Sequence, residues 1–141
     1  MASSKKNDLI SVASPHSIKK IELISEYVKA WIHILMLYKN CKGIVYIDCM
    51  SNSGLYKDDD GKEIEGTPLL VSEIIADAMT QYQDKKAYIY FNDLDSKKID
   101  LLKTRLPKQT GNFTIYTESM DANVLLRKIG TQFTDMFKDM H

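Results

Sequence analysis

Carboxylates that could bind a ligand follow three apolar stretches of this 141-residue sequence. They are Asp48, Asp93 and Asp121. A carboxylate at the end of a buried strand can accept hydrogen bonds from both hydroxyls of a ribose, because it has two acceptor oxygens. The ribose role fits Asp93 best, since it closes the second strand, and Asp95 is the better candidate for capping the helix that follows. Asp121 could reach an adenine amino group, although helix capping explains it almost equally well.

The first strand end, at Asp48, leads into small, turn-prone residues, CMSNSGL at 49–55. Backbone N–H groups face outward at such a loop, and small side chains let a ligand approach. The loop has a single glycine, Gly54, whereas the dinucleotide fingerprint GxGxxG needs three, and no GK[ST] follows to form a P-loop. A nicotinamide cofactor and a pyrophosphate cradle are therefore disfavoured. S-adenosylmethionine, which needs a close backbone but no such cradle, fits the pattern.

Three predicted strands, each followed by a helix, must position these residues. Apolar runs predict strands at 44–48, 87–91 and 113–116. Helices are expected from an N-cap at Thr67, from an N-cap at Ser96 through Leu106 to Pro107, and from about Ala122 to Ile129. Three strand-to-helix crossovers predict a parallel sheet with helices on both faces and ligands at the carboxyl ends of the strands.

A long amphipathic helix is predicted ahead of the first strand, because Ser14 and Pro15 supply a cap and a first-turn proline. It should run through about residue 39, with a buried face formed by Ile21, Ile24, Val28, Trp31, Leu35 and Tyr38. We expect residues 1–13 to be a disordered lead-in and residues 14–141 to form one α/β domain. Residues 56–66 are acidic around DDDG and predict an exposed hairpin or loop.

The composition excludes several classes of function. Acidic and basic residues number 19 each, so a general nucleic-acid-coating role is not expected. A weaker alternative is nucleic-acid contact through helix lysines such as Lys29 and Lys97. Cys41 and Cys49 lack metal-ligand spacing, and His16, His33 and His141 form no hydrolase constellation. No signal peptide or membrane span is evident, which predicts a cytoplasmic protein.

Five segments together resemble the three-Cys-motif partner family, which has the class I methyltransferase fold. They are HSIKKIELISEYVKAWIHIL at 16–35, YIDCMSNSGLY at 46–56, EGTPLLVSEI at 65–74, YFNDLD at 90–95 and SMDAN at 119–123. The resemblance spans nearly everything after residue 14. It implies a Rossmann-like, three-layer sandwich, here truncated to about three parallel strands with a long N-terminal helix.

The same resemblance implies a set of S-adenosylmethionine-binding residues. The loop residues surround the methionine part, Asp93 binds the ribose, Asp121 lies near the adenine, and His16 and Lys20 close over the site. The complete set is His16, Lys20, Asp48, Ser51, Asn52, Ser53, Gly54, Asp93, Leu94, Asp121 and Ala122.

One departure from the family concerns the first loop, which reads MSNSG where the family has a sequence resembling FAGPG. Asn52 therefore stands where a glycine is usual. Asparagine is the best non-glycine substitute at positive φ, but its side chain can obstruct a cofactor that lies against the backbone. Two alternatives stay open: the cofactor half of a methyltransferase, or a non-catalytic partner module that keeps the fold without the ligand.

A second departure is that the sequence stops before the fourth strand, whose end usually supplies the residues facing the methyl acceptor. The chain is thus expected to be a fragment that binds cofactor without turnover, or a half-domain with another role. The first strand would be an open sheet edge, which predicts a homodimer or a missing C-terminal half. A three-Cys-motif protein is a further expected partner. The apolar stripe through Phe133, Met136, Phe137 and Met140 could join the dimer interface or cover its own sheet.

Overall fold

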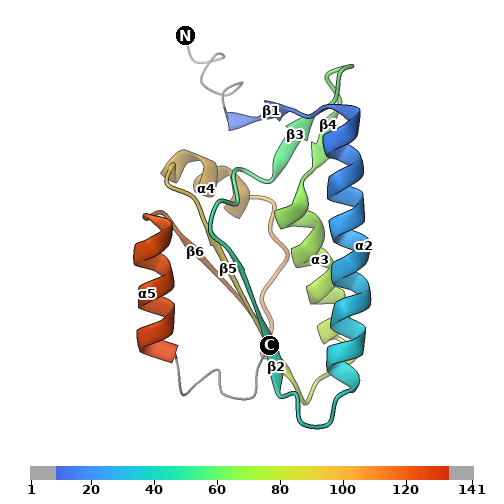
Figure 1. The fold of residues 1–141 in the computed structure, drawn as a ribbon, viewed down its shortest axis with the longest axis vertical. Coiled ribbons are helices and arrows are strands. Elements are labelled where there is room, and N and C mark those ends of the chain that lie inside the picture. The colour runs from blue at the N-terminus through green and yellow to red at the C-terminus, as the bar shows by residue number, and fades with distance from the viewer. Residues whose placement is uncertain (1–8, 134–141) are drawn as a thin grey trace.

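The computed structural model describes residues 9–133 and shows a mixed α/β fold (Figure 1). Its helices are α2 (Pro15–Leu37), α3 (Thr67–Met79), α4 (Ser96–Lys103) and α5 (Ala122–Phe133). Its strands are β1 (Ser11–Val12), β2 (Gly43–Asp48), β3 (Leu55–Lys57), β4 (Glu63–Glu65), β5 (Lys86–Asn92) and β6 (Phe113–Glu118).

The main sheet has the order β2-β5-β6, and both pairings are parallel. Asp48 pairs with Phe91, and Asn92 pairs with Glu118, so the three carboxyl ends meet at one edge of the sheet. The three predicted parallel strands are confirmed. Among the described strands, β2 has β5 as its single neighbour, and its other edge is open.

Helices cover both faces of this sheet, as predicted: α2 and α3 lie on one side of the strands and α5 on the other (Figure 1). The alternation of side chains along β5 explains the layering. Ala87, Ile89 and Phe91 join the large core shared with α2, α3 and α4. Tyr88 and Tyr90 join a smaller core with Leu125 and Ile129 of α5.

The helix starts follow the predicted positions, with two corrections to the caps. Ser14 caps α2 as expected, accepting a hydrogen bond from the Ser17 N–H at 3.2 Å. The N-cap of α3 is Gly66 rather than Thr67, and that of α4 is Asp95 rather than Ser96. Thr67 and Ser96 are the first residues of their helices, so each helix begins one residue earlier than predicted. The carboxylate of Asp95 accepts from the Lys97 N–H at 3.0 Å, a stronger cap than a hydroxyl.

The helix ends differ more from expectation. α4 ends at Lys103, so Leu106 lies beyond it, and α5 continues through Gly130 to Phe133 instead of ending at Ile129. A glycine lowers helix propensity but does not stop a helix that has a strong apolar face. Of the predicted C-terminal stripe, residues 134–141 lie outside the described part of the chain.

The buried face of α2 is rotated from the predicted one. Its buried residues are Ser25, Val28, Ile32 and Met36, whereas Ile24 and Tyr38 are exposed. Apolar residues occupy most of the circumference of this helix, so their spacing did not single out one face.

The segment before α2 is ordered from residue 9, in contrast to the predicted disordered lead-in; residues 1–8 lie outside the described part. Ser11 and Val12 pair with the strand Leu55–Lys57, and the Ala13 N–H donates to the Lys57 carbonyl at 2.8 Å. Hydrogen-bond pairing with the hairpin thus compensates for the segment's low apolar content. The hairpin itself, β3 with β4, is antiparallel as expected. No helix within residues 9–133 is long and apolar enough to cross a membrane.

Candidate functional site

The candidate site is built from three loops at the carboxyl ends of β2, β5 and β6. We call 49–54 the first loop, 93–95 the second and 119–121 the third. The parallel register brings them together, because each directly follows a strand of the same sheet. Asp48 stands at the start of the first loop, and Asp93 stands at the start of the second.

Asn92 connects the first and third loops and is the residue that sequence reasoning missed. Its side chain is 1% exposed. Its amide nitrogen donates to the Cys49 carbonyl at 3.1 Å and to the Met120 carbonyl at 2.8 Å, and its amide oxygen accepts from the Met120 N–H at 3.1 Å. The Ser51 N–H donates to the Asn92 carbonyl at 2.8 Å. The one available signal was a polar amide directly after the apolar run 87–91.

Asp93 connects the second loop to the first. One carboxylate oxygen accepts from the Asn52 N–H at 2.9 Å, and the other accepts from the Asp95 N–H at 3.0 Å. Because Asp95 caps α4, the capping role falls to Asp95 and not to Asp93, as the sequence indicated. Each carboxylate oxygen has two lone pairs, so Asp93 keeps capacity for two further donors.

Asp48 is the second carboxylate of the site. One of its oxygens accepts from the Met50 N–H at 3.2 Å. Burial raises the pKa of Asp48 above its ordinary value, the Met50 hydrogen bond lowers it, and the nearby charge of Asp93 raises it further. The paired carboxylates therefore favour a positively charged ligand group, which would offset their mutual repulsion.

The first loop holds a tight backbone conformation. Asn52 has a φ of 61°, and its side-chain oxygen accepts from the Ser53 N–H at 2.9 Å. This local bond is how an asparagine supports a left-handed conformation in place of glycine. Gly54 has a φ of 77°, and a Cβ added there would lie 2.8 Å from Cδ1 of Leu102. The space beside Gly54 thus belongs to the core.

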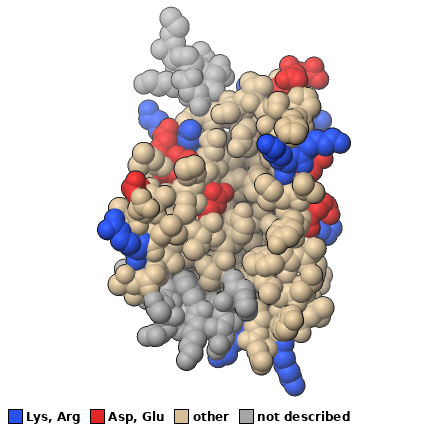
Figure 2. Space-filling view, in the orientation of Figure 1, with Lys and Arg blue, Asp and Glu red and all other residues tan. Residues whose placement is uncertain are grey.

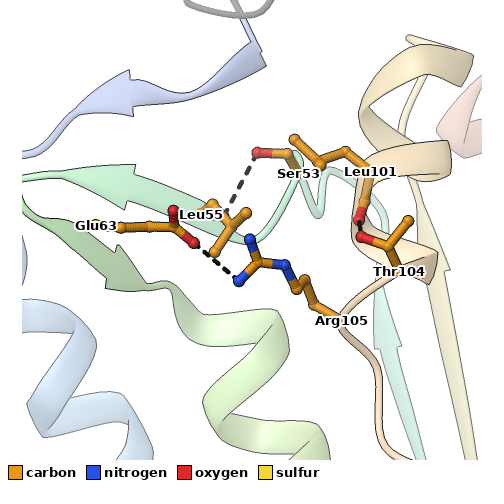
Figure 3. A network of polar contacts seen from close by, with 6 residues as sticks. All are labelled: Ser53, Leu55, Glu63, Leu101, Thr104 and Arg105. Carbon is orange, nitrogen blue, oxygen red and sulfur yellow. Dashed lines mark hydrogen bonds and ion pairs between the residues drawn. The ribbon is translucent and has the colours of Figure 1, made fainter.

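Serines of the first loop are buried and bonded within the chain. Ser51 donates to the Asn52 carbonyl at 3.2 Å, and Ser53 donates to the Leu9 carbonyl at 2.7 Å. Ser53 also accepts from the Leu55 N–H at 3.4 Å, where the loop enters β3 (Figure 3). The ordered N-terminal segment therefore braces the first loop, a contact between residues too distant in sequence to predict.

The hairpin next to the first loop is tied to the segment after α4. Arg105 forms an ion pair with Glu63 of β4 at 2.9 Å, across the gap between the two elements (Figure 3). Both side chains are nearly half exposed, so the pair contributes little stability and mainly sets the position of the hairpin.

The remaining predicted residues lie at the margins of the site. Asp121 accepts from the Asn123 N–H at 2.9 Å at the start of α5, which is the capping geometry, and Ala122 is the first residue of that helix. Leu94 is exposed, and its carbonyl accepts from the Ser119 hydroxyl at 3.2 Å. The third loop is thus positioned beside the second.

His16 and Lys20 are exposed on the first two turns of α2. Within the described part of the chain, neither makes a hydrogen bond or ion pair with the three loops. Hydrogen bonds therefore join the strand-end residues to one another, and in the described part of the chain none joins these two helix residues to them.

Two grooves lie away from the strand ends. One, of about 360 Å³, runs between α2 and α3 and includes Lys29, His33, Glu73 and Asp77. The other, of about 290 Å³, lies beside β6 and includes Lys103 and Lys108. Among residues 9–133, no group of three or more His, Cys, Asp or Glu side chains is placed to hold a metal ion.

Comparisons with protein-family models, with curated proteins and with solved structures gave no significant match.

Proposed function

We propose that this chain is the S-adenosylmethionine-binding half of a methyltransferase of the three-Cys-motif partner type, with a Rossmann-like class I fold whose described part has three parallel strands. Its methyl acceptor is unidentified. The parallel order β2-β5-β6, with helices on both faces, agrees with the first three strands of that fold. The sequence resemblance implies S-adenosylmethionine as the ligand, and the geometry of the strand ends supports that assignment.

The observation that carries the proposal is the pair of carboxylates at the ends of adjacent strands, Asp48 and Asp93, beside a loop with positive φ at Asn52 and Gly54. In the proposed complex Asp93 accepts hydrogen bonds from the two ribose hydroxyls. Asp48 faces the positively charged methionine end, whose charge would lower the pKa of Asp48. The third loop, with Asp121, borders the adenine.

The alternative is a non-catalytic, dimerising partner module, and one observation favours it. The polar groups of the site already bond to each other: Asp93 accepts from two backbone amides, and the Asn52 side chain accepts from its neighbour Ser53. A site that satisfies its own groups is stable without a ligand. Such a module would associate with a three-Cys-motif protein or another chain in place of the cofactor.

Calorimetric titration with S-adenosylmethionine and S-adenosylhomocysteine separates the two functions. We expect the native chain to bind both compounds, and Asp93→Asn to weaken binding at least about 10-fold, because the amide offers one acceptor oxygen where the carboxylate offers two. Asp100→Asn is the matched control, since it removes the same charge from an exposed position on α4. It should bind like the native chain.

Circular dichroism spectra must first show that the chain and both variants are folded. A folded native chain that binds neither compound would refute the cofactor site and favour the partner module. Equal binding by Asp93→Asn and the native chain would refute the assigned ribose contact.

A further inference from the structure

Helix α2 and its C-cap residue Tyr38 carry large apolar side chains that are exposed in the described part of the chain. Between 44% and 77% of each of these residues is accessible to solvent. They are Leu23, Ile24, Tyr27, Ile34, Leu37 and Tyr38. A surface helix normally carries polar residues opposite its buried face, so an apolar outer face indicates a second contact surface.

Five residues of this outer face follow a coiled-coil spacing, with steps of four, three, four and three positions along the helix. They are Leu23, Tyr27, Ala30, Ile34 and Leu37, and we call them the α2 stripe. The buried residues Val28, Ile32 and Met36 lie on the opposite side of the helix. The α2 stripe is therefore separate from the face that packs on the core.

The α2 stripe matches itself when two copies lie antiparallel. Ala30 is its midpoint and its smallest side chain, so two helices can approach closely there. Leu23 of one copy then faces Leu37 of the second copy, and Tyr27 faces Ile34. This two-fold symmetry within one helix favours a second copy of the same chain over an unrelated partner.

Polar residues along one side of the α2 stripe agree with this arrangement. Glu26 and His33 both border the groove next to α3. In an antiparallel pair, Glu26 of each copy lies beside His33 of the other, so an acceptor meets a potential donor twice. In a parallel pair, Glu26 would instead lie beside Trp31, which has one indole N–H donor. The polar pairing is therefore compatible with the antiparallel arrangement, and the two-fold match of the apolar residues selects it.

The exposed apolar area is large enough for a stable interface. Taking roughly 200 Å² for a fully exposed large side chain, the four large residues of the α2 stripe offer roughly 560 Å² per copy. Ile24 and Tyr38 beside the stripe add roughly 220 Å², which brings the total close to the roughly 800 Å² per partner of a standard interface. Figure 2 shows the face that carries the edge strand β2, with α2 along its right side as in Figure 1. Most charged side chains on it lie toward the margins, with one acidic group near the middle.

We propose that the α2 stripe is a homodimer interface, in which the helices of two copies pack antiparallel across a two-fold axis near Ala30. This association does not depend on cofactor binding. It gives the predicted dimer a specific surface on α2.

Sedimentation equilibrium of the whole chain at micromolar concentration tests the proposal. We expect a dimer, and we expect Ile34→Glu and Tyr27→Glu each to weaken dimerisation by about 100-fold, because each buries a charge near the centre of the contact. Leu126→Glu on α5 is the matched control, because it places the same charge at another half-exposed leucine. It should dimerise like the native chain.

Using two variants guards against the possibility that one of them misfolds. Both substituted positions are exposed, and a thermal melt of each variant checks that it is folded. A native chain that stays monomeric would overturn the proposal, and so would a dimer that both folded variants retain. Mixing Leu23→Cys with Leu37→Cys tests the orientation. An antiparallel pair gives a mixed disulfide between the two variants, and its absence under oxidising conditions would overturn the antiparallel arrangement.

Discussion

Replacing Asn92 by alanine should destabilise the protein and loosen the loops at the same time. The change removes three hydrogen bonds and leaves two carbonyls and one N–H without their partner, at a position that is 1% exposed. A net loss of about 1 kcal/mol per bond, with an added penalty for buried groups left unpaired, gives about 3–5 kcal/mol. A typical domain has about 5–15 kcal/mol of stability, so this is a large share.

Urea unfolding, followed by circular dichroism, measures this loss. The midpoint should fall while the slope with denaturant stays constant, because the buried surface is unchanged. Asn112→Ala is the matched control: it removes amide bonds to Met79 and Tyr82 at 3.0 and 3.2 Å, in a part of the fold remote from the three loops. Both variants should lose stability, and only Asn92→Ala should also change S-adenosylmethionine binding.

Asn92→Asp gives the same reasoning a pH dependence. An aspartate there would face the carbonyls of Cys49 and Met120, so burial and those oxygens would raise its pKa above the unfolded value. The folded state would then bind a proton at a higher pH than the unfolded state does. The stability that Asn92→Asp lacks relative to the native chain would be regained as pH falls through the raised pKa.

For Asn92→Ala, a loss of stability below about 1 kcal/mol would refute the assigned role of the amide.

Two further predictions concern the first loop. Asp48→Asn should raise the free energy of unfolding at pH 7, because an amide avoids the desolvation and the Asp93 repulsion yet still accepts from the Met50 N–H. The native chain should lose stability as pH rises from about 3.9 through the raised pKa, and thermal melts across that range should show no such loss in Asp48→Asn. Gly54→Ala should cost about 3 kcal/mol in chemical denaturation, from positive φ and the contact with Leu102, whereas Gly61→Ala, also at positive φ but with nothing within 4 Å, should cost about 1 kcal/mol. Equal costs would contradict the packing argument.

The main sheet was predictable because its strands are continuous apolar runs bounded by polar residues. The run Ala87–Phe91 needs no knowledge of its neighbours to be read as a buried strand. The gathering of Asp48 and Asp93 at one edge follows from parallel pairing alone. That Asp95 suits the capping role better than Asp93 was also readable, although the cap itself was predicted one residue late, at Ser96.

The rest depended on contacts between distant segments. Ser11 and Val12 have too little apolar surface to indicate a strand, and they become one because the hairpin at 55–65 offers an edge. The role of Asn92 depends on the positions of the Cys49 and Met120 carbonyls, which come from two other parts of the chain. The face of α2 could not be read from spacing, because apolar residues cover most of that helix and only its packing selects the buried side.

Besides its local bonds, the first loop is fixed by bonds that reach far along the chain. Ser53 bonds to a residue 44 positions earlier, Asn52 to one 41 positions later, and Cys49 to one 43 positions later. Each of these bonds closes a long segment of chain. The conformational entropy lost on closing that segment is offset only once the sheet has formed. No short peptide containing the loop would hold this shape. The candidate site is therefore a property of the assembled fold and cannot be transplanted as a linear motif.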